Sequence, residues 1–236
     1  MKVLVTDYAW PDLEIEEAIL GEAGIELIRA TATDPASLAA QASDADGILA
    51  CWASISREVL ESAGRCRIVA RMGIGLDNID VQQCTEQNIL VTNVPDYCAV
   101  DVAEHTLALL LGMARNIPYF HQQAKAGSYQ LEPHSPLRRL VGQRLGIVGW
   151  GAIGQQVARR AQAFGLDVVV TRHNMQQPIE GFSLQPLETL LATSDYISLH
   201  LPYNKQTHHL LNTQRLGSMK PTAFLINTAR GGLIDH

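Results

Sequence analysis

The stretch GIVGWGAIGQQVARRAQAFG, residues 146–165, decides the fold. Gly149, Gly151 and Gly154 stand in GxGxxG spacing between an apolar strand-like run and an amphipathic helical segment. Glycines also occur where a strand simply turns into a helix, so the spacing alone is a weak signal. In this context each glycine has a role: a tight bend, close backbone approach to a pyrophosphate, and close helix packing. We therefore predict a dinucleotide-binding turn made of Gly149, Gly151, Ala152, Ile153 and Gly154.

The strand after this turn indicates which dinucleotide is bound. An acidic residue about 20 residues on usually accepts from the ribose 2′-hydroxyl. Here the run LDVVVTRHN, residues 166–174, ends in Thr171, Arg172 and His173 instead. A hydroxyl followed by a guanidinium suits a 2′-phosphate, so these three residues favour NADP over NAD. The alternative is a solvated surface arginine in a protein that still prefers NAD.

Short β-rich runs alternate with helix-length segments along the whole chain, which predicts parallel strands joined by crossover helices. A first group of runs ends near Val94, and a second group begins after Pro95. We predict an α/β protein with two doubly wound parallel-sheet domains, residues 1–97 and 98–236. Between the two groups, residues 98–117 form a helical segment that is apolar on more than one side. Such a helix is buried either between domains or at a subunit contact, and a homodimer is the expected assembly.

Composition excludes several classes of partner. A formal charge of −6, without any cluster of lysine or arginine, argues against nucleic acid. The absence of an apolar run near 18 residues argues against a membrane span, and MKVLVTDYAW, residues 1–10, reaches Asp7 too early for a signal peptide, so a cytoplasmic location is expected. His208 and His209 lack a carboxylate or cysteine companion, and the four cysteines are scattered, so no metal site is expected.

Five motifs together resemble the D-isomer-specific 2-hydroxyacid dehydrogenase family. They are RMGIGLDNID (71–80), VPDYCAVDVAEHTLALLL (94–111), GWGAIG (149–154), SLHLP (198–202) and INTARGGLID (226–235). They occur in the family's order and spacing over nearly the whole chain, and VPDYC is similar to the branch containing the C-terminal-binding proteins. The resemblance implies a flavodoxin-like substrate domain, an NAD(P)-binding Rossmann domain, and interconversion of a small 2-oxo acid and its D-2-hydroxy acid.

The resemblance also implies roles for individual residues. Arg230 of NTARGG matches the arginine that holds the substrate carboxylate and polarises the C2 oxygen. Its fork of donors independently fits a planar carboxylate at the end of a strand, although a structural arginine is the alternative. The backbone of Gly73, Ile74 and Gly75 is similar to the loop that meets this carboxylate. The remaining matches line the cofactor: Thr106 near the nicotinamide, His200, Pro202 and Thr207 beside the adenosine, and Asn227, Thr228 and Ala229 beneath the nicotinamide.

In the family, a glutamate and a histidine downstream of the arginine loop supply the proton. The printed sequence ends at His236, before the positions where this pair would stand. We therefore expect a Rossmann domain that is incomplete at its C-terminal end, and a 236-residue chain with little turnover although the complete product is an enzyme. The alternative function is a dinucleotide-sensing interaction protein, in which cofactor binding controls assembly.

Overall fold

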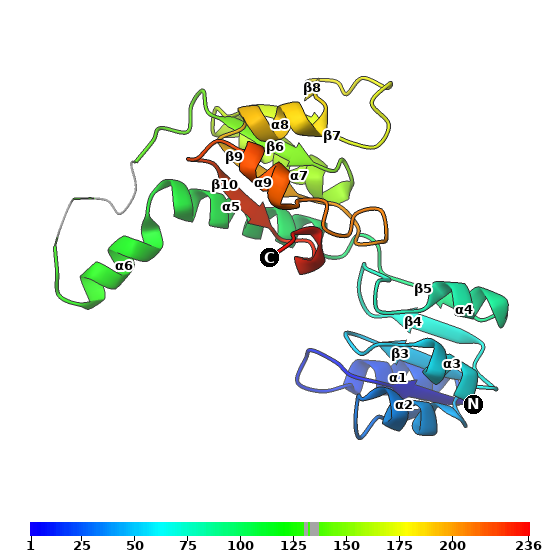
Figure 1. The fold of residues 1–236 in the computed structure, drawn as a ribbon. Helices are drawn as coiled ribbons and strands as arrows, with labels where there is room; N and C mark the ends of the chain where they lie inside the picture. The colour runs from blue at the N-terminus through cyan, green and yellow to red at the C-terminus, as the bar shows by residue number, and fades with distance from the viewer. Residues whose placement is uncertain (130–131, 133–136) are drawn as a thin grey trace. The chain divides into compact units, whose positions relative to one another are not determined.

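The computed structural model describes residues 1–129, 132 and 137–236. The described chain divides into two compact units, Met1–Tyr97 (unit 1) and Cys98–His236 (unit 2). Each unit is built around its own parallel sheet, with helices packed on it (Figure 1).

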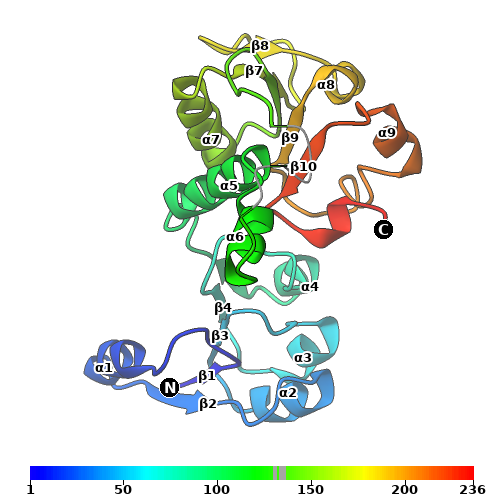
Figure 2. The ribbon, with the colours of Figure 1, turned by 90° about the vertical axis from the view of Figure 1, so that its left-hand side faces the viewer.

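The sheet of unit 1 has the strand order β2-β1-β3-β4-β5, and all its pairs are parallel. This is the order of flavodoxin-like sheets. Helices α2 and α3 lie side by side on one face, and α1 covers the other (Figure 2). The elements are β1 (Lys2–Val5), α1 (Glu14–Glu22), β2 (Glu26–Arg29), α2 (Pro35–Ala42), β3 (Gly47–Ala50), α3 (Arg57–Ser62), β4 (Ile68–Arg71), α4 (Val81–Glu86) and β5 (Leu90–Thr92).

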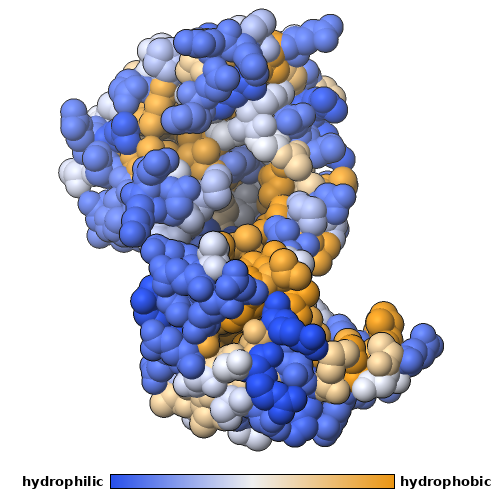
Figure 3. All heavy atoms as spheres, turned by 90° about the vertical axis from the view of Figure 1, so that its right-hand side faces the viewer, coloured by the Kyte–Doolittle hydropathy of each residue, from blue (hydrophilic) through white to orange (hydrophobic). Residues whose placement is uncertain are grey.

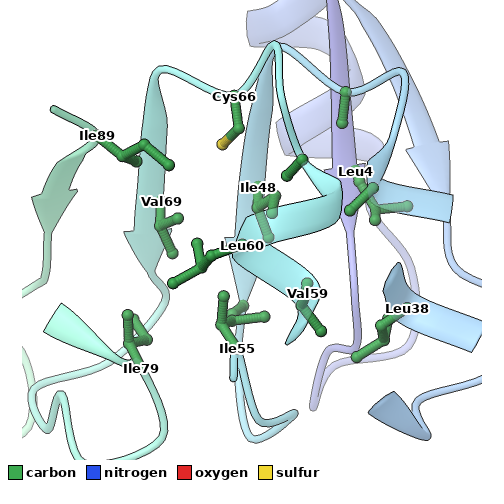
Figure 4. Packing of buried hydrophobic residues seen from close by; sticks show 14 of the residues in the cluster. Leu4, Leu38, Ile48, Ile55, Val59, Leu60, Cys66, Val69, Ile79 and Ile89 are labelled. Carbon is green, nitrogen blue, oxygen red and sulfur yellow. The ribbon is translucent and has the colours of Figure 1, made fainter. Parts of the chain in front are cut away.

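The core of unit 1 lies between the central strands and the helices α2 and α3. Ile48 and Val69 project from neighbouring strands toward Leu60 of α3, and all three side chains are buried (Figure 4). The helix ends are defined locally. The Asp34 carboxylate accepts from the Ser37 amide at 3.0 Å, and the Asp80 carboxylate accepts from the Gln83 amide at 2.9 Å. These caps satisfy amides that have no acceptor within the helix.

The sheet of unit 2 has the order β10-β9-β6-β7-β8, again with parallel pairs. Numbered 1 to 5 from β6 and read from the β8 edge, this is the order 3-2-1-4-5 of a dinucleotide-binding sheet. Helices α5 and α7 pack together on one face, and α8 and α9 lie on the other (Figure 2). The elements are α5 (Ala99–Ala114), α6 (Ile117–Lys125), β6 (Arg144–Val148), α7 (Ala152–Ala163), β7 (Asp167–Thr171), β8 (Ser183–Leu184), α8 (Leu187–Thr193), β9 (Tyr196–Leu199), α9 (Thr213–Ser218), β10 (Phe224–Asn227) and the 3₁₀ helix η1 (Gly231–Leu233).

The α/β fold class with two doubly wound parallel sheets is confirmed, and two local features differ from the prediction. The helix expected over residues 98–117 ends at Ala114, because Asn116 adopts a left-handed φ of 51°, and a separate helix α6 with Pro118 in its first turn begins at Ile117. Proline lacks the N–H that would continue the helical hydrogen bonds, but it is well suited to a first turn. The two-residue strand β8 is too short to produce an alternating pattern.

The helix α5 has one buried face, which packs against α7 and β10 within unit 2. Leu107 and Leu110 lie on this buried face. Three apolar side chains of α5 are exposed, Val100 at 44%, Leu109 at 41% and Met113 at 43%. Packing within unit 2 therefore accounts for one side of the helix and leaves another side uncovered.

The face of the molecule that Figure 3 shows is mostly polar. In the view of Figure 3, hydrophilic residues cover most of the area and hydrophobic residues gather in smaller patches. Within the described residues, no helix has the length and apolar character needed to cross a bilayer.

Candidate functional site

The glycine turn joins β6 to α7. Gly149 has a φ of 106°, and a β-carbon there would overlap the carbonyl oxygen of His200. A β-carbon at Gly154 would overlap the carbonyl oxygen of Gly149, so α7 packs closely on the turn. Gly151 differs from both, because nothing lies within 4 Å of where its β-carbon would be. Two glycines are thus required by the fold, and the third faces open space.

That open space lies at the N-terminus of α7. Gly151 is the N-cap residue, and Gly151 and Ala152 are exposed while Ile153 is half-buried. The first amides of a helix lack intrahelical acceptors, and the helix dipole adds partial positive charge there. A pyrophosphate can therefore approach the backbone at Gly151 without meeting a side chain.

The residues at the end of β7 lead into a loop to which Arg172 is hydrogen-bonded. Thr171 is buried, His173 is exposed, and Arg172 donates from Nη2 to the carbonyl oxygen of Gln177. The Nε atom of Arg172 is buried and has no acceptor among the residues that the structure describes. The Arg172 guanidinium therefore lies beside the end of β7, and its Nε remains available as a hydrogen-bond donor.

The loop after β9 begins at His200. The Nε2 atom of His200 lies 2.8 Å from the hydroxyl of Ser198, and burial lowers the pKa of His200 to about 4. The imidazole is consequently neutral at physiological pH. Further along, the Thr207 hydroxyl donates to the carbonyl oxygen of Pro202 at 2.7 Å and shapes this loop.

The end of β10 is tied to α5. The Thr106 hydroxyl is fully buried and donates to the carbonyl oxygen of Val102 at 2.8 Å. It also lies 2.9 Å from the Thr228 hydroxyl. Because the single hydrogen of the Thr106 hydroxyl goes to Val102, the Thr228 hydroxyl is the donor in this second hydrogen bond. The two threonines therefore hold each other in place, and α5 fixes the end of the strand.

Arg230 stands on a turn shaped by Asn227. The Asn227 side chain donates to the carbonyl oxygen of Arg230 at 2.8 Å and accepts from the Ala229 amide at 3.0 Å. Arg230 itself is half-buried, and its Nη1 donates to the carbonyl oxygen of Ala229 at 3.0 Å. The glycine turn, Arg172, His200 and Arg230 thus follow the carboxyl ends of neighbouring strands in one sheet, the edge at which such sheets bind ligands.

Gly73, Ile74 and Gly75 belong to unit 1, on the loop after β4. The carbonyl of Gly73 accepts from the Val94 amide at 3.1 Å, and that of Ile74 accepts from the Asn93 side chain at 2.8 Å. Among the residues that the structure describes, the amides of these three residues have no acceptor. The loop therefore keeps its donors available at the carboxyl edge of the sheet.

Sequence reasoning did not identify Asp7, which organises the neighbouring loop of unit 1. Its carboxylate accepts from the amides of Cys51, Trp52 and Ala53 at 3.0, 2.6 and 3.1 Å. Burial alone would raise the pKa of Asp7, but these amides and the Thr6 hydroxyl together lower it. The available signal was an acidic residue two positions after the apolar run of β1.

The paired histidines have local partners. His208 Nδ1 lies 2.9 Å from the Tyr203 hydroxyl, and His209 Nδ1 lies 3.4 Å from the Asp235 carboxylate. Across the described part of the chain, no group of three histidine, cysteine or carboxylate side chains is arranged to hold a metal ion.

Comparisons with known proteins identify the family. The family described as "D-isomer specific 2-hydroxyacid dehydrogenase, NAD binding domain" matches residues 107–236. The D-3-phosphoglycerate dehydrogenase of Methanocaldococcus jannaschii is 36% identical over 100% of the chain and 45% of its own length. The chain spans 36% to 59% of the length of the first curated relatives that it matches.

Solved structures share the fold. D-lactate dehydrogenase from Aquifex aeolicus, complexed with NAD and lactic acid, superposes with a TM-score of 0.91 at 31% identity, over 99% of this chain and 70% of that one. An acyclic imino acid reductase in complex with NADPH and D-Arg has a TM-score of 0.88 at 31% identity, over 100% of this chain and 76% of that one. Unit 2 thus contains an NAD(P)-binding domain, and the chain belongs to the D-isomer-specific 2-hydroxyacid dehydrogenase family.

Proposed function

We propose that the whole protein is an NAD(P)-dependent oxidoreductase that interconverts a small 2-oxo acid and its D-2-hydroxy acid. The observation that carries this proposal is the placement of two features at one sheet edge. The open glycine turn and the Arg230 turn both follow carboxyl ends of strands in unit 2. The glycine turn suits the pyrophosphate of a dinucleotide, and the Arg230 turn suits a carboxylate.

The residues of unit 2 suit the cofactor. The space at Gly151 is open to a pyrophosphate. Asn227, at the end of β10, and the next residues Thr228 and Ala229 are the proposed support for the nicotinamide half. The bound cofactor supplies the hydride. In unit 2, Arg230 holds the carboxylate of the substrate and polarises the C2 oxygen. In unit 1, the amides of Gly73, Ile74 and Gly75, which have no acceptor among the described residues, are donors suited to a carboxylate.

A substrate panel on the whole protein tests this function. Glyoxylate, hydroxypyruvate, pyruvate and bulkier 2-oxo acids are each supplied with NADPH and with NADH, and cofactor oxidation is followed by absorbance. We expect turnover with at least one 2-oxo acid. Nucleotide-dependent assembly without any turnover would instead support the alternative of a dinucleotide-sensing protein. The panel also identifies the substrate, since pocket shape decides among acids that share one carboxylate and one carbonyl.

NADP is the proposed cofactor, with Arg172 as the residue that recognises its 2′-phosphate. Arg172→Asp should raise the Kd of NADPH by about ten- to a hundredfold while changing that of NADH far less, because a charged hydrogen bond becomes a repulsion. Fluorescence titration of both cofactors measures the effect. Arg159→Gln is the control, because Arg159 is an exposed arginine on α7 and its replacement removes a positive charge elsewhere in unit 2. Equal affinities of the unmutated protein for NADPH and NADH would refute the assignment.

We also propose a homodimer. The exposed apolar side chains Leu109 and Met113 of α5 and Ile117 of α6 support it, at 41%, 43% and 55% exposure. A second copy packed on these side chains would remove apolar surface from water. Sedimentation equilibrium should give twice the chain mass, and Met113→Glu should shift the equilibrium toward monomer. A monomer at every concentration would contradict this assembly.

A further inference from the structure

The turn that carries Arg230 has little internal support at its C-terminal end. The 3₁₀ helix η1 is three residues long, and the main-chain hydrogen bonds within this segment measure 3.0 and 3.2 Å. Short 3₁₀ segments have poorer hydrogen-bond geometry than α-helices. Asn227 fixes the start of the turn. The position of its end therefore depends on contacts with other parts of unit 2.

The loop after β9 supplies those contacts through its main chain. The His209 amide donates to the Gly232 carbonyl at 2.9 Å, and the Leu211 amide donates to the Leu233 carbonyl at 2.9 Å. The Leu211 carbonyl in turn accepts from the Asp235 amide at 3.0 Å. The side chains of Leu211 and Leu233 are both fully buried. The turn and the loop therefore form one packed segment.

The Tyr203 ring packs directly on Gly232, two residues after Arg230. A β-carbon at Gly232 would come within 2.5 Å of Cε2, 2.8 Å of Cζ and 3.0 Å of Oη of this ring. Gly232 is not among the glycines with a positive φ, so its backbone conformation does not itself demand glycine. Glycine is needed at this position because the Tyr203 ring occupies the place of a side chain.

Other side chains hold the Tyr203 ring where it is. The ring is half-buried and packs against the buried apolar residues on one face of the sheet of unit 2. Its hydroxyl lies 2.9 Å from Nδ1 of His208, and the two rings meet edge to face. His208 stacks on His209, whose Nδ1 lies 3.4 Å from the Asp235 carboxylate. Side chains thus connect Tyr203 to both the middle and the end of the turn.

We infer that Tyr203 is a positioning residue for Arg230. Its ring fixes Gly232 on the C-terminal side of the turn, as Asn227 fixes Ala229 on the N-terminal side. The guanidinium is thereby kept in the geometry that binds a carboxylate. The inference rests on the proposed function, because that function assigns Arg230 to the substrate. It requires no contact between Tyr203 and the substrate.

Tyr203→Leu in the whole protein is the test. We expect kcat/KM for a 2-oxo acid to fall by about ten- to a hundredfold, because a small displacement of a positioned group is costly to the rate. The Kd of NADPH, measured by fluorescence titration, should stay close to that of the unmutated protein. Tyr203→Phe keeps the ring on Gly232 and should retain most of the activity.

Phe164→Leu is the matched control. Phe164 is 41% exposed and follows the last turn of α7, at the edge of the sheet opposite to Arg230. The substitution removes an aromatic ring from unit 2 without touching the turn. We expect this variant to keep its kcat/KM.

The decisive measurement is Tyr203→Leu in the Arg230→Gln background. Because Tyr203 acts through the guanidinium, its replacement should lower the residual kcat/KM by less than about twofold once Arg230 is absent. A merely structural role predicts the same ten- to hundredfold loss in both backgrounds, and that result overturns the inference. A loss that weaker NADPH binding explains completely overturns it as well.

Gly232→Ala tests the contact from its other side. The new β-carbon would displace the Tyr203 ring, so we expect a similar fall in kcat/KM. The double variant Gly232→Ala/Tyr203→Leu has room for the methyl group and should be more active than Gly232→Ala alone. Undiminished kcat/KM in Gly232→Ala, or no recovery in the double variant, would contradict the inference. If Tyr203→Leu does not fold, the result with Gly232→Ala decides.

Two further outcomes separate this inference from the proposed function. Equal kcat/KM in Tyr203→Leu and the unmutated protein leaves the function standing and removes Tyr203 from it. If the protein reduces no 2-oxo acid, the function fails and NMR decides the inference. The signals of the Gly232 amide and of Arg230 Nε should then shift in Tyr203→Leu and remain near their original positions in Tyr203→Phe. Unchanged signals in Tyr203→Leu overturn the inference.

Discussion

Replacing Arg230 by glutamine in the whole protein should lower kcat/KM for a 2-oxo acid by about 10²–10⁴, which corresponds to the loss of one or two charged hydrogen bonds. The turn itself should survive the change. Asn227 bonds to the main chain of Ala229 and Arg230, and these bonds do not involve the arginine side chain. The loss therefore reports on substrate recognition and not on unfolding.

Steady-state kinetics with a saturating cofactor measure this effect, and cofactor titration checks that unit 2 is intact. Arg144→Gln is a suitable control, because Arg144 stands at the amino end of β6 and pairs with Asp167 at 2.7 Å, away from the edge that carries Arg230. We expect the control to keep its kcat/KM. An Arg230→Gln protein with undiminished kcat/KM would show that its guanidinium does not hold the substrate.

Gly149→Ala should both destabilise unit 2 and abolish cofactor binding. The φ of 106° is unfavourable for any residue with a side chain, and the new β-carbon would overlap the His200 carbonyl. Such strain costs about 2–3 kcal/mol, and the overlap adds to it. For a chain of this size, we expect the melting temperature to fall by roughly 5–10 °C.

Gly151→Ala provides a matched comparison. Nothing lies within 4 Å of its β-carbon position, and its φ of −81° suits alanine. The melting temperature without cofactor should therefore stay near that of the unmutated protein, while cofactor affinity falls because the methyl group occupies the space of the pyrophosphate. Calorimetric melting and cofactor titration of both variants separate the two roles. Unchanged affinity in Gly151→Ala would show that the pyrophosphate does not approach this residue.

The parts of the fold that depend on short-range patterns could be predicted from the sequence. The strand, the three glycines and the amphipathic helix around residue 150 are consecutive, so their periodicity identifies a parallel sheet and the turn within it. Arg230 could be proposed as a site residue from the sequence for a similar reason. A lone arginine between an apolar strand and two glycines has few structural roles. The family assignment, confirmed by the comparisons, followed from several such motifs in order.

The remaining features depend on contacts between distant residues. Asp7 bonds to amides 44 to 46 positions away, and the Thr106 hydroxyl meets Thr228 across 122 positions. Arg71 ends an apolar strand, and only the structure shows that its guanidinium is buried and donates to Asn78. Periodicity describes which face of an element is buried, and it carries no information about which polar groups meet there.

The hydrogen bonds between Asp7 and the loop after β3 go to main-chain amides alone. The side chains of Cys51 and Ala53 are buried, whereas the hydrogen bond to the Trp52 amide does not depend on the Trp52 side chain. Trp52, at 66% exposure, occupies a position where the side chain is exchangeable while the backbone stays anchored. Substitutions at Trp52, natural or engineered, can therefore change the chemical character of the loop after β3 without changing its backbone.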